Sequence, residues 1–290
     1  MPIRLRDVHH TYAAGTPWER KVLRGVDLEV RRGECLGLLG ANGSGKTTLI
    51  RHLNGLLLPE RGTVEVGDRC IRPGDRLRRL LSREVGMVFQ FPEKQLFAES
   101  VFDDVASGLK FTGVPGEDVP GRVEAALERV GLDPREYGDR PPLSLTWGEK
   151  RQAALAGVLA LDTPRLVFDE PGAGLDPAGR KRLLGLIEDL VRREGRSVVF
   201  VSHHLDDLFR VADRLAVLEG GRVVFGGDLE KFCRQDDLSR WGLAWPPLIE
   251  LMKAVGEGRP GLRSDVTTPE EAADVLRDGR EGHGGSPDHG

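Results

Sequence analysis

Alternating apolar and polar side chains mark two segments near the start of the chain. Residues 3–12 (IRLRDVHHTY) and 22–30 (VLRGVDLEV) follow this pattern, which predicts strands with one buried face. Four other short segments consist mainly of consecutive apolar residues: residues 35–40, 85–89, 165–169 and 197–201. Continuous apolar runs of this length are typical of parallel strands buried on both faces. The pattern therefore predicts a mainly parallel sheet.

Helical periodicity fills the intervals between these strands. It is found in six segments: residues 46–57, 101–110, 121–131, 147–162, 177–194 and 205–212. Buried strands that alternate with helices predict an α/β fold with helices on the faces of the sheet. Residues 214–227 (RLAVLEGGRVVFGG) then predict a hairpin that turns at Gly220 and Gly221.

The pattern weakens after about residue 230. Residues 241–255 and 267–278 each predict a short helix, and we assign them to a small C-terminal appendage, residues 231–277. The final residues, 278–290, are glycine-rich and charged, which predicts disorder. The main domain is accordingly expected to span residues 1–230.

Composition excludes several classes of function. A net charge of −4 from 42 basic and 46 acidic residues gives no global electrostatic reason to expect a nucleic-acid partner. No apolar run approaches the roughly 18 to 20 residues that cross a bilayer, and the first residues lack the apolar core of a signal peptide. The three cysteines show no metal-binding spacing, which favours reduced thiols in a cytoplasmic protein.

The strongest chemical motif is GANGSGKTT, residues 40–48. It matches GxxxxGK[ST] and lies between a predicted buried strand and a predicted helix, the context expected of a P-loop. Such a loop points backbone N–H groups at a triphosphate, while Lys46 reaches the β- and γ-phosphates and Thr47 offers its hydroxyl to Mg²⁺. We therefore expect ATP and Mg²⁺ as ligands. The predicted nucleotide-binding residues of the loop are Gly40, Asn42, Gly43, Ser44, Gly45, Lys46, Thr47 and Thr48.

A second motif is RLVFDEP, residues 165–171. An apolar strand that ends in two acids places Asp169 at the strand end, where it can hold Mg²⁺ through water. The next residue, Glu170, is then free to activate an attacking water molecule. This arrangement favours hydrolysis over phosphate transfer to a second substrate.

These motifs, in this order, resemble the nucleotide-binding subunit of an ABC transporter over residues 3–228. The resemblance implies a P-loop NTPase fold with a mainly parallel core, an antiparallel β subdomain and a helical subdomain at about residues 91–160. It also implies roles for single residues. These are Gln90 as the Q-loop ligand of Mg²⁺ and γ-phosphate, Asp176 in the D-loop, His203 as the catalytic switch histidine and Tyr12 as the aromatic that stacks on adenine. His204 departs from the family, which usually has aspartate there.

One family motif is altered in this chain. LTWGE, residues 145–149, falls on the LSGGQ signature, which in the family packs against ATP held by the other subunit of a dimer. Thr146 and Gly148 keep the hydroxyl and the second glycine, Glu149 replaces glutamine, and Trp147 replaces the first glycine. A residue where the backbone approaches a phosphate normally has to be small. Either the indole turns away and activity survives, or the ATP site that this signature shares with the other subunit is impaired. An impaired shared site would favour a heterodimer.

Within the ABC family the chain is most similar to the second type of ATPase in energy-coupling factor (ECF) transporters. The similarity rests on residues 13–30, 88–108 and 156–177 and on the two C-terminal helical segments. It implies a second ATPase subunit, an integral membrane T component, a substrate-binding S component, and a peripheral location on the cytoplasmic face of a prokaryotic membrane. Contact with the membrane scaffold is expected at residues 90–111. Residues 72–83 (RPGDRLRRLLSR) are more typical of a solvated helix face than of a contact with lipid.

Two other functions stay open at this point: an ATP-binding regulatory protein and an ABC protein of DNA maintenance. The second class carries long coiled-coil or zinc-bearing insertions between P-loop and signature, and neither pattern is present between Lys46 and Leu145. The first class conflicts with the presence of Glu170 and His203. Uptake of a vitamin or of a cobalt or nickel ion, driven by ATP hydrolysis, is therefore the function that the sequence favours.

Overall fold

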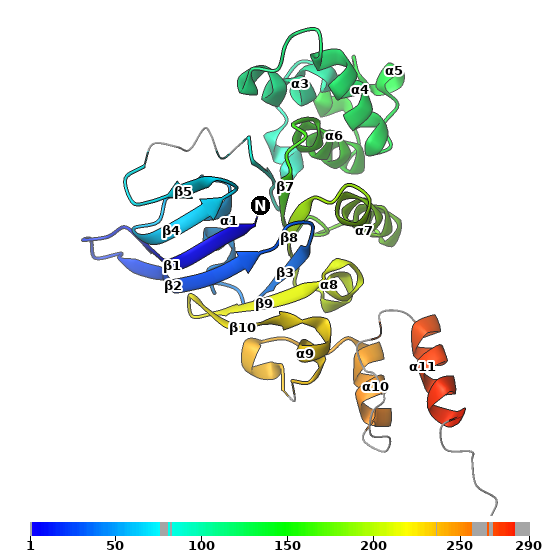
Figure 1. Ribbon diagram of the computed structural model, residues 1–290. Helices are drawn as coiled ribbons and strands as arrows, with labels where there is room; N and C mark the ends of the chain where they lie inside the picture. The colour runs from blue at the N-terminus through cyan, green and yellow to red at the C-terminus, as the bar shows by residue number, and fades with distance from the viewer. Residues whose placement is uncertain are drawn as a thin grey trace, which may run out of the picture.

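The computed structural model describes residues 2–75, 81, 83–235, 237–256, 266 and 269–281. Its centre is a six-stranded sheet in the order β10-β9-β3-β8-β7-β6 (Figure 1). The strands are β3 (Cys35–Leu39), β6 (Val85–Val88), β7 (Arg165–Asp169), β8 (Ser197–Val201), β9 (Arg214–Glu219) and β10 (Arg222–Asp228). All neighbours pair in parallel except β9 and β10, which form the predicted hairpin.

The continuous apolar runs follow from burial on both faces of this sheet. Strands β3, β7 and β8 are buried at every position. Their residues divide between two apolar cores: Leu36 and Leu38 belong to one, Cys35 and Leu39 to the other. Because neighbouring side chains in a strand point to opposite faces, each face requires its own apolar set.

A second sheet of four antiparallel strands has the order β2-β1-β4-β5. Its strands are β1 (Ile3–Tyr12), β2 (Arg20–Val30), β4 (Arg61–Val66) and β5 (Arg69–Ile71). We did not predict β4 and β5 individually, although the alternation in residues 61–66 and the Gly67-Asp68 turn were available as signals. Helix α1 (Lys46–Leu53) contributes Leu49, Ile50 and Leu53 to the core between the two sheets.

The remaining helices form two groups. One group stands apart from both sheets at the top of Figure 1: α3 (Val101–Thr112), α4 (Val119–Arg129), α5 (Pro134–Tyr137) and α6 (Trp147–Ala160). The other group, α7 (Pro177–Arg192) and α8 (Leu205–Val211), covers the face of the central sheet opposite α1. The helix predicted at residues 46–57 ends earlier, at Leu53, because the chain turns at Asn54 and Gly55. The φ of Gly55 is 75°.

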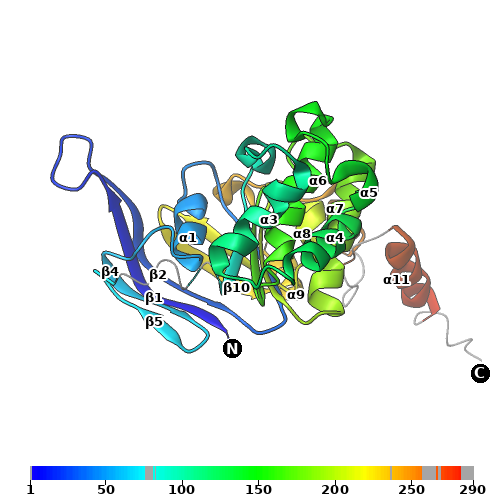
Figure 2. The ribbon, with the colours of Figure 1, turned by 90° about the horizontal axis from the view of Figure 1, so that it is seen from above.

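The C-terminal region contains α9 (Leu229–Cys233), α10 (Pro247–Gly256) and α11 (Pro269–Glu281). The first part of this region packs against β10 through an aromatic cluster of Phe225, Phe232, Trp241 and Trp245. Seen from above, α11 and the four-stranded sheet lie on opposite sides of the molecule (Figure 2). Helix α11 continues four residues into the segment predicted to be disordered, because each residue that extends a helix adds a backbone hydrogen bond.

Some predicted features fall outside the described residues. Residues 282–290 of the expected disordered tail do so, as do residues 76–80 and 82 of the basic segment at residues 72–83. Among the helices that the structure does describe, none is long and apolar enough to cross a membrane.

Candidate functional site

The glycine-rich loop joins β3 to α1, as the motif predicts. Gly40 and Gly45 have φ values of 144° and 110°, which side chains rarely tolerate. A Cβ on Gly40 would lie 2.2 Å from the carbonyl oxygen of Leu218, so no other residue fits there. The loop therefore curls tightly and ends at the N-terminus of α1, whose free N–H groups favour an anion.

Two side chains of the loop suit a phosphate ligand. Lys46 is 6% exposed, and its Nζ donates to the carbonyl oxygens of Gly40 at 2.7 Å and Ala41 at 3.2 Å. Burial lowers the pKa of Lys46, and the carboxylates of Glu170 and Asp169 oppose this shift. The Ser44 hydroxyl is buried without a hydrogen-bond partner in the described part of the chain. A free buried donor beside a buried ammonium group fits the oxygens of a polyphosphate.

Asp169 and Thr47 meet at the end of β7. Burial, and then the neighbouring charge of Glu170, raise the pKa of Asp169 to about 6. A hydrogen bond from the Thr47 hydroxyl and the positive charges of Arg51 and Lys46 oppose this shift. A carboxylate and a hydroxyl held together are the hard oxygen donors that Mg²⁺ takes beside a nucleotide. These residues therefore fit the ion that the motifs imply.

Glu170 lies between two residues that are distant in sequence. Gln90 Nε2 donates to Glu170 Oε2 at 2.9 Å, and His203 Nε2 lies 2.6 Å from Glu170 Oε1. The backbone of Glu170 has a φ of 49°, and its N–H donates to Val201 at the end of β8. The ends of parallel strands β6, β7 and β8 thus bring together three residues that the sequence predicted as one site.

Tyr12, the predicted adenine platform, lies at the end of β1 beside the same loop. Its hydroxyl is 3.3 Å from the hydroxyl of Thr48, and its ring contacts that of His10 edge to face. The C-terminal appendage also borders the site, because residues 242–247 line a cavity of about 380 Å³ together with residues 40–42 and 203–206.

The predicted signature residues form a separate group at the start of α6. Thr146 caps the helix through a reciprocal capping box with Glu149, and the Tyr137 hydroxyl donates to Glu149 at 2.9 Å. Hydrogen bonds from the backbone and hydroxyl of Thr146, with that from Tyr137, lower the pKa of Glu149. Glu149 thus has a structural role at the position where the family has glutamine.

The indole of Trp147 is turned toward its own chain. It is 44% exposed, and a Cβ on Gly174 would lie 3.1 Å from its Cη2 atom. The guanidinium of Arg151 lies 5.2 Å from the ring centroid, at the range of a cation–π contact. The indole therefore packs beside the loop that leads to Asp176, whose carboxylate caps α7 through Gly179 N at 2.7 Å.

Arg151 is a site residue that we did not predict. It is 5% exposed and donates to the carbonyl oxygens of Ala173, Pro171 and Gln90. It therefore connects the signature helix to the segments that carry Gln90 and Glu170. Its neighbours Glu149, Lys150 and Gln152 are also polar, so no local pattern distinguished it.

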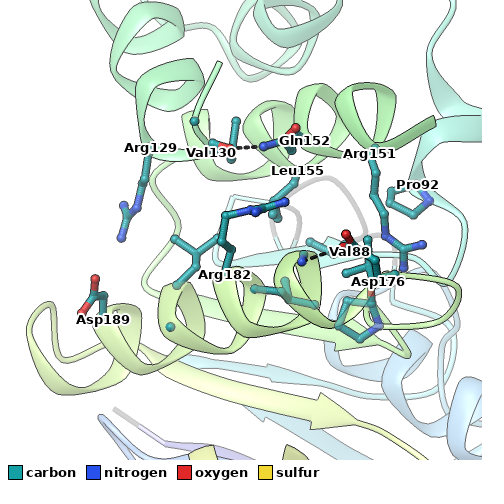
Figure 3. Close-up of a pocket in the computed structure, with 18 of the residues that line it drawn as sticks. Val88, Pro92, Arg129, Val130, Arg151, Gln152, Leu155, Asp176, Arg182 and Asp189 are labelled. Carbon is teal, nitrogen blue, oxygen red and sulfur yellow. Dashed lines mark hydrogen bonds between the residues drawn. The ribbon is translucent and has the colours of Figure 1, made fainter. Parts of the chain in front are cut away.

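Figure 3 shows the cleft behind this connection, between α4, α6 and α7. It has a volume of about 850 Å³, and Arg151 and Arg182 reach into it from opposite sides. The cleft lies between the helical group and α7. The Arg129–Glu194 ion pair spans it at one end.

Comparisons with known proteins agree with this geometry. The family model described as "ABC transporter" matches residues 23–173. The energy-coupling factor transporter ATP-binding protein EcfA2 of Symbiobacterium thermophilum is 43% identical to this chain over 278 residues, which are 96% of each chain. The EcfA2 protein of Clostridium tetani is 38% identical over 277 residues, which are 95% of this chain and 96% of that protein.

Solved structures of ABC ATPases are also similar to this chain. CbiO1 from Clostridium perfringens, part of the ABC transporter complex cbiONQ, superposes with a TM-score of 0.69 and 30% identity, covering 89% of this chain and 95% of that chain. The ATP-binding cassette MJ0796, dimeric and bound to ADP and Pi, superposes with a TM-score of 0.70 and 25% identity, covering 78% and 98%. The predicted fold class and family are confirmed: the chain belongs to the ABC transporter ATPases and, among them, to the ATP-binding subunits of energy-coupling factor transporters.

Proposed function

We propose that this chain binds and hydrolyses ATP as the energy-coupling subunit of an ECF importer, which takes up a vitamin or a cobalt or nickel ion. The observation that carries the proposal is the position of Glu170, held between Gln90 and His203 beside the Asp169–Thr47 pair. A carboxylate held in this way at the end of a phosphate loop is suited to accept a proton from water.

Each part of the site has a distinct task in this proposal. The loop N–H groups, Ser44 and Lys46 hold the phosphates, and Tyr12 supports the base. Thr47, Asp169 and Gln90 would hold Mg²⁺, which neutralises charge on the β- and γ-phosphates when bound. Glu170 accepts the proton of the attacking water. His203 keeps the carboxylate oriented and lies ready to contact the γ-phosphate.

We place the contact with the membrane partners at residues 90–111, on the cytoplasmic face of the membrane. Phe91, Phe97 and Phe111 are exposed there, and Phe97 is 77% exposed. The backbone N–H groups of Phe97 and Ala98 both donate to the buried carboxylate of Asp104 at 2.8 Å, which fixes this loop on α3. Since Arg151 donates to the Gln90 carbonyl, movement of this surface would reach both the signature helix and the catalytic site.

The altered signature supports pairing with a different ATPase chain. The indole of Trp147 rests on Gly174 of its own chain, at the position where the family has the first glycine of the signature. In a dimer with shared sites, this chain's phosphate loop and Glu170 would then form the stronger site with an intact partner signature. The site that uses this chain's signature would be the weaker one.

The Trp147→Gly variant is expected to raise ATP turnover of the assembled complex several-fold. Glycine removes the side chain from a position of close backbone approach, at a helix cost of about 1 kcal/mol or less. Steady-state ATPase assays of the complex measure the effect, with Trp147→Phe as a control that keeps an aromatic ring against Gly174. Unchanged or lower turnover would count against an impaired site.

Steady-state ATP hydrolysis by the purified chain tests the proposed function directly. The chain is assayed alone and mixed with a paralogous ECF-type ATPase from the same genome. Activity is expected chiefly in the mixture, because each composite site needs residues from two chains. Robust activity of this chain alone would overturn the heteromeric arrangement, and absence of hydrolysis in the mixture and in the full membrane complex would overturn the ATPase proposal.

A further inference from the structure

Arg20 is a basic residue beside the phosphate loop that no family motif includes. It begins β2 and lies directly opposite Tyr12 in the β1–β2 ladder. Its Nη2 atom lies 3.3 Å from the position that a Cβ on Gly43 would occupy. The guanidinium therefore borders the loop at Gly43, which has a φ of 79° and where a side chain would crowd it.

The start of β2 is held firmly against this loop. Cβ atoms on Gly45 and Gly221 would lie 3.2 Å and 2.2 Å, respectively, from the carbonyl oxygen of Val22. The N–H of Gly221 also donates to the carbonyl oxygen of Ser44 at 3.1 Å. Close backbone packing on both sides therefore fixes where the strand begins, and with it the approach of Arg20.

The charge of Arg20 is not compensated within the described part of the chain, where its side chain has neither an ion pair nor a hydrogen bond. Some other arginines of the same sheet have acidic partners: Arg4 with Glu29 at 2.9 Å and Arg61 with Asp7 at 3.0 Å. An arginine that lies against a phosphate loop without an acid has five N–H donors available for phosphate oxygens.

We infer that Arg20 is a second cationic contact for the phosphates of the bound nucleotide, in addition to Lys46. The inference rests on the proposed nucleotide site. Arg20 borders the loop at Gly43, next to Tyr12 in the sheet, whereas Lys46 is buried at the start of α1. The two cations thus flank the loop and would bind a nucleoside polyphosphate more strongly than a nucleoside.

The test measures ATP affinity by calorimetry in a Glu170→Gln background, which avoids turnover. Arg20→Ala is expected to weaken ATP binding about 3- to 10-fold, as for a charge-assisted contact that solvent partly screens. Arg20→Lys should recover part of this loss. The difference in ATP affinity between the Glu170→Gln parent and the Arg20→Ala variant should decrease as the salt concentration increases, because exposed charges are screened.

Lys21→Ala is the matched control. It removes the same charge from the next position of β2, opposite Thr11, and is expected to leave ATP affinity unchanged. Equal ATP affinities for the Arg20→Ala and Lys21→Ala chains would overturn the inference, as would a loss that is independent of salt. If neither the unmodified chain nor the Glu170→Gln parent binds ATP, the proposed function fails rather than Arg20 alone.

Discussion

Replacing Glu170 by glutamine is expected to lower steady-state ATP hydrolysis of the assembled transporter by about 100-fold or more, the range of a lost general base. The amide has nearly the same shape and can still accept a hydrogen bond from Gln90, but it cannot take a proton from water. ATP binding should therefore persist while turnover is lost. Phosphate release measures turnover, and calorimetry measures ATP binding on the same sample.

Glu188→Gln provides the matched control for that experiment. Glu188 forms an exposed ion pair with Arg210 at 3.0 Å, remote from the loop, so the same chemical change should leave hydrolysis nearly unaffected. If the Glu170→Gln complex hydrolyses ATP at half the parent rate or faster, Glu170 is not the base. If it loses ATP binding as well, its main role is to organise the site.

Phe97→Asp is expected to weaken assembly with the membrane components by roughly 30- to 1000-fold, the range for loss of an aromatic interface anchor. The ring is 77% exposed on a loop that Asp104 holds in place, so its surface is available without rearrangement. A new charge there would have to lose its water on docking. ATP hydrolysis by the ATPase pair without membrane components should stay unchanged, because Phe97 does not contact the catalytic residues.

Co-purification of the tagged ATPase pair with its detergent-solubilised membrane partners measures assembly. Val224→Asp serves as the control, since Val224 is an exposed apolar residue of similar kind on β10. Normal assembly of the Phe97→Asp complex would place the docking surface elsewhere. Equal loss with both variants would indicate a general effect of added charge.

The sequence by itself determined the features that depend on local order along the chain. Strands buried on both faces must be apolar at successive positions, so β3, β7 and β8 were readable from the sequence. The glycine spacing of the phosphate loop was readable for a similar reason, since its curl is set within nine residues. The two short strands β4 and β5 were missed because their period-2 pattern covers few residues.

Only the tertiary structure decided the contacts between segments that are distant in sequence. The predicted roles of Gln90, Glu170 and His203 gave no reason why Glu170 should contact both of the others. This contact depends on β6, β7 and β8 ending at one edge of the sheet. The direction of the Trp147 indole was equally undetermined. It depends on Gly174, which leaves room for the ring, and on Arg151, which lies over it, and no local pattern encodes such packing.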